Sequence, residues 1–314
     1  MEDYILDDKV KVFFNKIKFT PKTSISFSKN NIILFFFFYI FIPIGISLTF
    51  FIIKLSISNF FIPPIAPLIN PATATIGLLI LIIDNNNYFW KNGFWLLIFF
   101  PIFQLTAALI GGDIFGNGID FGNGINLKDI LELIFTVIII ISVISFYLYQ
   151  NRSQEIFNLK NSFRMQNIST TLIVVAIGLI VAILFNIVLS RFVGSGINQT
   201  SSNQGSIESV LKFGNIVEKI TIIFGILIIA PIIEELLYRK TLAEIGNNKW
   251  WGIPISTIFF AFLHIQVFND WQNIMPFLPL GIVAAVIYFY FRNTVPIIMI
   301  HFGSNLVALI FVFV

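Results

Sequence analysis

Long apolar runs recur from residue 32 to residue 314, and short polar segments separate them. A helix needs ~20 predominantly apolar residues to cross the hydrocarbon core of a bilayer. The runs near this length predict nine helical spans, at residues 32–53, 65–83, 94–110, 130–149, 171–190, 217–237, 252–268, 275–291 and 296–314. Several prolines interrupt the second run, which is also compatible with a broken or re-entrant segment, so the pattern predicts eight or nine spans.

The amino-acid composition indicates the class of protein to which this pattern belongs. Of the 314 residues, 57% are hydrophobic and only 11% are charged, and the mean hydropathy is +0.91. These values exclude a soluble domain and are typical of a polytopic membrane protein. The predicted fold is therefore an all-α bundle of transmembrane helices. The sequence contains no cysteine, which excludes disulfides, thiolate metal ligands and cysteine nucleophiles.

The lysine and arginine residues divide unequally between the two sides of the membrane. With nine spans and a cytoplasmic N-terminus, most of the 19 fall in cytoplasmic segments, as the positive-inside rule requires. This bias accounts for the sequence pI near 9.0 without a nucleic-acid partner. The abundance of Phe, Ile, Asn and Lys is typical of an AT-rich bacterial genome, so we expect an integral protein of the bacterial inner membrane, surrounded by the lipid bilayer.

Two adjacent carboxylates stand at the end of the sixth predicted span, in the stretch PIIEELLYRK at 231–240. Ionisable residues inside a span cost ~2.5 to 3.5 kcal/mol each, so they usually face the protein interior. Glu235 and Arg239 are four residues apart on one helix face and can pair, whereas Glu234 lies about 100° away, aligned with Tyr238. The simpler alternative places both carboxylates at a helix end among lipid headgroups.

The only two histidines of the chain, His264 and His301, both fall inside predicted spans. Each has a neighbour one helical turn away on its own face, Phe260 before His264 and Asn305 after His301. A single intramembrane histidine is often a packing residue with a hydrogen bond. Together with the Glu234–Arg239 stretch, however, the histidines form a cluster of ionisable and amide side chains on three different spans.

This set of side chains fits the hydrolysis of a carbonyl compound, of which a peptide bond is the obvious candidate. A carboxylate and an imidazole at bonding distance can hold and deprotonate a water molecule, while a second imidazole and an amide can donate hydrogen bonds to a developing oxyanion. In an alternative chemistry, Glu234, His264 and His301 would bind Zn²⁺ and leave its fourth position to water. The HExxH motif of soluble metalloproteases does not occur.

Three short motifs resemble those of a known family. EELLYR at 234–239, FAFLH at 260–264 and HFGSN at 301–305 are similar to the motifs EExxxR, FxxxH and HxxxN of the CAAX protease and bacteriocin-processing family of intramembrane proteases, also called the Abi family. The motifs occur in the family's order, with one span between the second and third. The resemblance implies an intramembrane endopeptidase, with or without Zn²⁺, because the family's metal dependence is unsettled.

The resemblance also implies a role for each matched residue. It assigns Glu234 and His264 to water activation, and His301 and Asn305 to stabilisation of the oxyanion. Glu235 and Arg239 become a supporting pair, and Phe260 a packing residue. The chain then divides into a cytoplasmic segment at 1–31, spans without a matched motif at 32–215, and a catalytic core at 216–314.

Two other functions remain compatible with the same residues. A membrane scaffold or bacteriocin-immunity protein could keep the polar cluster without catalysis. A proton-coupled transporter could use Glu234, His264 and His301 to line a pathway, although we find no inverted repeat to support it. The expected partner of an endopeptidase is a peptide or membrane-protein substrate, cleaved near the cytoplasmic face. Nothing in the sequence indicates a prenylated substrate.

Overall fold

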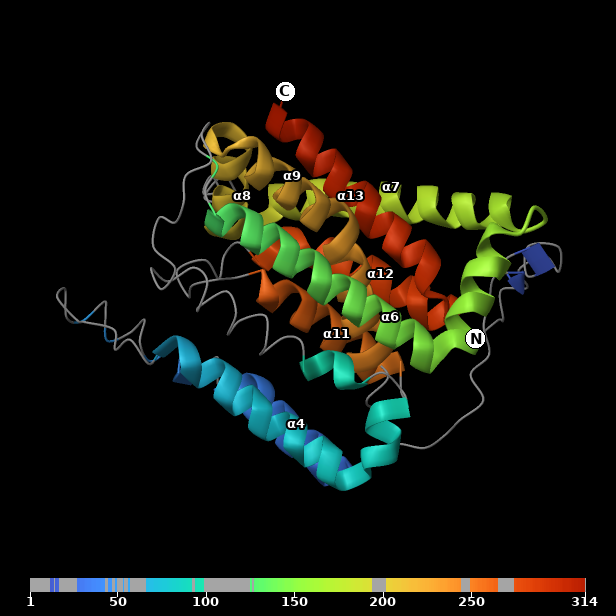
Figure 1. The fold of residues 1–314 in the computed structure, drawn as a ribbon. Helices are drawn as coiled ribbons and strands as arrows, with labels where there is room; N and C mark the ends of the chain where they lie inside the picture. The colour runs from blue at the N-terminus through green and yellow to red at the C-terminus, as the bar shows by residue number, and fades with distance from the viewer. Residues whose placement is uncertain are drawn as a thin grey trace.

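The computed structural model describes most of the chain from residue 27 onward (Figure 1). The described residues form helices, with no strand among them. Apart from isolated positions, the described ranges are 27–42, 66–91, 94–98, 127–193, 202–243, 249–264 and 274–313. The predicted N-terminal segment at 1–31 lies largely outside these ranges.

The described helices follow one another along the chain, and three of them run on into π-helical turns. They are α2 Lys29–Phe36 with π-helix η1 Phe37–Phe41, α4 Ala66–Lys91, 3-10 helix η2 Phe94–Ile98, α6 Leu127–Phe163, α7 Ile168–Val193, α8 Ser202–Phe213, α9 Ile216–Phe224, π-helix η4 Gly225–Ile229, α10 Ala230–Glu235, π-helix η5 Leu236–Leu242, α11 Lys249–Leu263, α12 Leu278–Phe291 and α13 Thr294–Phe313.

Four segments of the described chain are long and apolar enough to cross a membrane. They are Ile168–Leu189, Ile216–Leu242, Ile274–Phe291 and Thr294–Phe313. They confirm the helices predicted at 171–190, 217–237, 275–291 and 296–314, and with them the class of helical integral membrane protein. The total of eight or nine spans and the cytoplasmic N-terminus stay predictions.

The span predicted at 252–268 is not one continuous helix. Helix α11 ends at Leu263, and its 15 residues reach about 22 Å at 1.5 Å per residue, less than the ~30 Å of a hydrocarbon core. The backbone N–H of His264 bonds to the carbonyl of Ala261, which tightens the chain into a turn. His264 therefore lies one residue beyond the end of α11, and the remainder of the predicted span, residues 265–268, lies outside the described residues.

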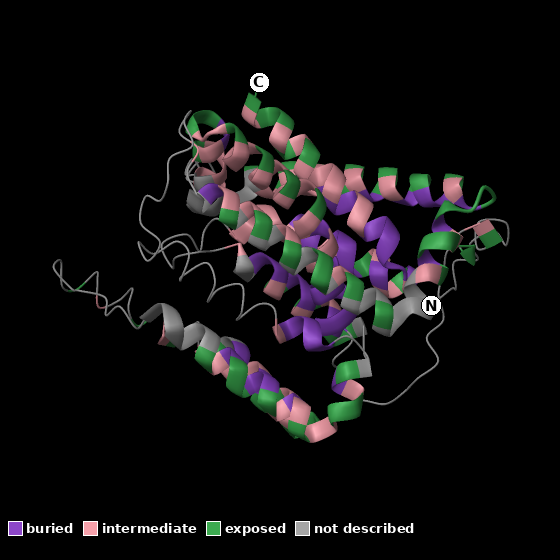
Figure 2. Ribbon diagram, viewed as in Figure 1, coloured by how far each residue is buried: buried purple, intermediate pink, exposed green. Residues whose placement is uncertain are grey.

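Buried residues gather where α11, α12 and the first half of α13 meet (Figure 2). Helices α7, α12 and α13 pack on one another, and α11 packs along α12. By contrast, the outer face of α7 exposes Ile173, Ile177, Ile180 and Leu184 at a spacing of three or four residues. Such an apolar outer face suits contact with lipid chains, while the interior of the bundle can hold polar groups.

The N-terminal helices are joined to this bundle through an aromatic core. Helix α2 and η1 pack on α4, and the Tyr39 hydroxyl donates to the Leu97 carbonyl in η2. Phe36 lies 5.6 Å from Phe259 of α11, measured between ring centroids. One continuous cluster of buried side chains therefore connects the N-terminal helices with η5 and α11.

Asp84 of α4 fixes the beginning of α2. Its carboxylate accepts hydrogen bonds from the Ser28 backbone N–H at 2.7 Å and from the Asn31 side-chain amide at 2.8 Å. Partial burial raises the pKa of the Asp84 carboxyl, but the hydrogen bonds lower the pKa by more than burial raises it, so the pKa lies below its ordinary value.

We expect the contact between α2 and α4 to weaken at acidic pH. Because the pKa of Asp84 is lowered in the folded state, its contribution is complete above about pH 4 and is lost as the pH falls through the lowered pKa. Hydrogen exchange of α2 amides should show faster opening below that pH. In Asp84→Asn the opening should be faster already at neutral pH, because the free energy of opening should be lower by about 1 kcal/mol or less. Equal pH dependence in both proteins would contradict the role of Asp84.

Candidate functional site

The paired glutamates lie on a helix that contains two π-helical turns. Asn215 caps the start of α9, since its side chain accepts from the Glu218 N–H while Glu218 accepts from the Asn215 N–H. The helix then widens into η4, tightens into α10, and widens again into η5. Glu234 and Glu235 are the last two residues of α10, between the two π-helical turns. Such π-helical turns are frequent at functional sites.

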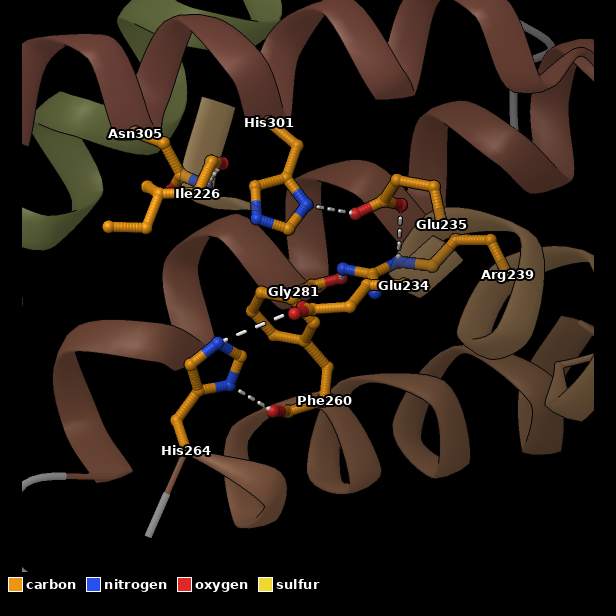
Figure 3. A network of polar contacts seen from close by, with 9 residues as sticks. All are labelled: Ile226, Glu234, Glu235, Arg239, Phe260, His264, Gly281, His301 and Asn305. Atoms are coloured by element: carbon orange, nitrogen blue, oxygen red, sulfur yellow. Dashed lines mark hydrogen bonds and ion pairs between the residues drawn. The ribbon is translucent and has the colours of Figure 1, made fainter. Parts of the chain in front are cut away.

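Glu235 stands at the centre of a buried three-residue network (Figure 3). One of its carboxylate oxygens lies 3.1 Å from Nε of Arg239, and the other lies 2.8 Å from Nδ1 of His301. All three side chains are buried, with exposures of 0%, 0% and 2%. The pairing of Glu235 with Arg239, predicted from their spacing, is thus confirmed. The contact between Glu235 and His301 was not predicted.

The Arg239 guanidinium is held against α12 and α11 as well. Its Nη2 reaches toward the Gly281 carbonyl at 3.5 Å, and its Cζ lies 4.4 Å above the centroid of the Phe260 ring. A Cβ atom on Gly281 would lie 3.1 Å from the Thr257 side chain, which is tighter than ordinary contact. Glycine at 281 therefore allows α12 to approach α11 closely, and its carbonyl to approach the guanidinium.

Glu234 faces the other histidine. Its Oε2 lies 3.7 Å from Nε2 of His264, and the two side chains are 22% and 16% exposed, unlike the sealed network around Glu235. Nδ1 of His264 lies 2.7 Å from the Phe260 carbonyl, to which it donates when it carries the proton. The ring is thereby oriented with Nε2 toward Glu234. Among the described residues, Glu234 Oε2 has no hydrogen-bond partner.

Phe260 separates the two glutamate–histidine pairs and touches both. Its ring centroid lies 4.8 Å from that of His264 and 5.5 Å from that of His301. Tyr238, the residue aligned with Glu234, packs edge-on against the same ring at 5.7 Å. The resemblance assigned Phe260 to packing alone, whereas the structure adds that its carbonyl orients His264 and its ring face supports Arg239.

Asn305 lies one turn beyond His301 on α13, and its side-chain amide donates to the Ile226 carbonyl of η4 at 2.9 Å. The widened turn η4 is thus tied to the helix that carries His301. An amide group has two N–H donors, so Asn305 keeps one N–H beyond the bond to Ile226. The predicted oxyanion role of Asn305 stays a prediction.

The predicted zinc ligands do not come together. Glu234 and His264 form one pair, while His301 turns its Nδ1 to Glu235. No group of three His, Asp or Glu side chains within the described part of the chain could hold a metal ion. In this structure Glu234, His264 and His301 do not form a three-ligand metal site, and zinc binding by them stays a prediction.

Fold and site together define a helical integral membrane protein that encloses ion-paired glutamate, arginine and histidine side chains. Residues 216–307 match the family described as type II CAAX prenyl endopeptidase Rce1-like. This match confirms the family predicted from the three motifs, over the part of the chain that contains them. It begins at the first residue of α9 and ends two residues after Asn305.

Similar proteins occur in two bacteria. The chain is 26% identical to UPF0177 protein YbdI of Lactococcus lactis over 154 residues, which cover 48% of this chain and 80% of the relative. It is also 26% identical to an uncharacterized protein of Mycoplasma capricolum over 253 residues, covering 76% of this chain and 72% of the relative. Both similarities must extend upstream of residue 216, into the helices without a matched motif. No solved structure matches the chain significantly.

Proposed function

We propose that the protein is an intramembrane endopeptidase that hydrolyses a peptide bond near the cytoplasmic face of a bacterial cell membrane. The observation that carries this proposal is the pairing of Glu234 with His264 at 3.7 Å, on a ring that the Phe260 carbonyl orients. The family match supports it, because the family is described as an endopeptidase and the match includes both residues. The substrate would be a peptide or another membrane protein.

The geometry supports a reaction through an activated water. A water molecule placed between Glu234 Oε2 and His264 Nε2 can hydrogen-bond both atoms at about 2.8 Å, which their separation of 3.7 Å permits. Glu234 takes one proton from the water while the water oxygen attacks the carbonyl carbon of the peptide bond. The tetrahedral intermediate then breaks its C–N bond, and the proton on Glu234 passes to the departing amine.

The second histidine supplies the stabilisation of negative charge. Because Nδ1 of His301 faces Glu235, only Nε2 of this ring can point toward a substrate. When it carries a proton, Nε2 donates a hydrogen bond to the oxyanion, and the second N–H of Asn305 is its predicted partner. Glu235 and Arg239 hold the His301 ring in place from a fully buried position.

The test is peptide-bond cleavage by purified protein in lipid, on an unbiased library of membrane peptides. Glu234→Gln keeps the shape of the side chain and removes the base, so we expect it to abolish cleavage. Glu208→Gln is the matched control, because Glu208 pairs with Lys212 on α8 and should retain cleavage. A chelator arm shows whether the reaction needs a metal. Equal cleavage by wild type and Glu234→Gln would overturn the proposal, and no cleavage by either would favour the scaffold or immunity function.

A further inference from the structure

An aromatic ring outside the three motifs covers His264. Phe277 lies in the short helical turn of residues 274–277 that leads into α12. Its ring is stacked on the His264 imidazole, with centroids 4.2 Å apart and an interplanar angle of 24°. The Phe260 ring contacts the same imidazole at a larger tilt, 51°. The imidazole is therefore in contact with two aromatic rings.

The turn that carries Phe277 is itself fixed from a distant part of the chain. The Asn186 side-chain amide on α7 donates to the Pro276 carbonyl at 3.1 Å. Asn186 is half-buried and lies inside the segment Ile168–Leu189, which is long and apolar enough to span a membrane. A hydrogen bond between an amide side chain and a backbone carbonyl in such a segment links two helices at a defined point.

We propose that Phe277 is a positioning residue for His264, and that Asn186 of α7 holds Phe277 in place. The Phe260 carbonyl fixes Nδ1 of His264 within the plane of the ring, and Phe277 restricts the ring from one face. Together these two contacts hold the His264 ring in the orientation in which its Nε2 faces Glu234. As a statement about catalysis the inference rests on the proposed function, whereas the position of the ring can be measured without any reaction.

The composition of the chain makes this measurement direct. His264 and His301 are the only histidines, so selective labelling of histidine gives NMR signals from two imidazole rings. His264→Gln and His301→Gln assign the signals. In wild type the ring current of Phe277 shifts the carbon-bound protons of His264 upfield, because the two rings are stacked. In Phe277→Leu these signals should move downfield, while the signals of His301 should stay in place.

The same variants are then assayed for cleavage. A reacting group misplaced by about 1 Å can lose about 10- to 100-fold in rate, so Phe277→Leu should lower kcat by that range with little change in KM. Phe277→Tyr keeps the ring and should retain both the NMR signals and kcat. Phe311→Leu removes an exposed ring from α13 and is the matched control for the loss of a phenylalanine.

Asn186→Leu leaves the Phe277 ring intact and removes the hydrogen bond to Pro276, so it serves if Phe277→Leu does not fold. It should move the His264 signals in the same direction by a smaller amount. Unchanged His264 signals in both variants would overturn the inference, and so would displaced signals with wild-type kcat. If wild type cleaves no peptide, the proposed function fails separately, and the NMR comparison of wild type with Asn186→Leu, both of which keep the Phe277 ring, decides whether Asn186 holds the stacked arrangement of Phe277 and His264.

Discussion

Replacing Glu235 with alanine should lower the free energy of unfolding by about 3 to 5 kcal/mol, the cost of removing one partner from a buried ion pair. The change leaves the Arg239 guanidinium at 0% exposure without its carboxylate, and it removes the group that His301 Nδ1 contacts. Unfolding in detergent by heat or denaturant measures the loss. Cleavage should fall as well, because His301 is no longer held.

The chain contains a matched exposed pair for comparison. Glu208 and Lys212 are also four residues apart on a helix, but their side chains are 26% and 53% exposed, and their atoms lie 3.7 Å apart. Glu208→Ala should therefore cost no more than about 1 kcal/mol. The difference between the two variants isolates the effect of burial at a constant helical spacing.

A double substitution tests whether the cost of Glu235→Ala comes from the stranded charge. Glu235→Leu combined with Arg239→Met removes both charges, and replacing a buried pair by apolar residues is often nearly neutral. The double variant should thus be more stable than Glu235→Ala while remaining inactive. An inert Glu235→Ala beside a severely destabilised Arg239→Ala would show that the two residues do not depend on each other.

His264→Ala should give the opposite combination of effects. We expect cleavage to fall by about 10²- to 10⁴-fold, the contribution of a positioned acid or base, while the unfolding transition stays close to that of wild type. The reason is the position of the ring, which lies beyond the end of α11 and outside the fully buried network of Glu235, Arg239 and His301, so its loss leaves that network intact.

The pairing of His264 with Glu234 adds a second readout. If both residues act on one water molecule, the double variant Glu234→Gln with His264→Ala should be no slower than the slower single variant. Multiplied losses would mean that the two residues act in separate steps. Cleavage at the wild-type rate by His264→Ala would remove this histidine from the mechanism.

The sequence predicted contacts that depend on helical spacing. Glu235 with Arg239, and Phe260 with His264, are each four residues apart, and a helix brings such residues to one face. Both contacts are present. Four of the predicted spans are also present as helices, because length and apolar content suffice to identify them.

Contacts between side chains on different helices could not be predicted from the sequence. His301 is 66 residues from Glu235, and Asn186 is 90 residues from Pro276. Which side chains meet at such separations depends on how the helices pack, and no local pattern contains that information. The end of α11 was misjudged for a related reason, because an apolar run does not show where the chain leaves its helix.

The widened turn η4 has a consequence for the length of the segment between Asn215 and Glu234. Asn215 ties the start of α9 to Asp129 of α6, while Glu234 meets His264 at the other end. A π-helical turn holds one residue more than an α-helical turn, so loss of one residue would restore regular winding without breaking the helix. Because the widened turn absorbs the missing residue, Glu234 would stay close to its present orientation relative to Asn215, whereas loss of a residue from the regular winding of α9 or α10 would rotate Glu234 by about 100°. The regular turns of α9 and α10 therefore set the direction of the Glu234 carboxylate relative to Asn215, and we expect a one-residue deletion in those turns to impair cleavage more than a deletion in η4.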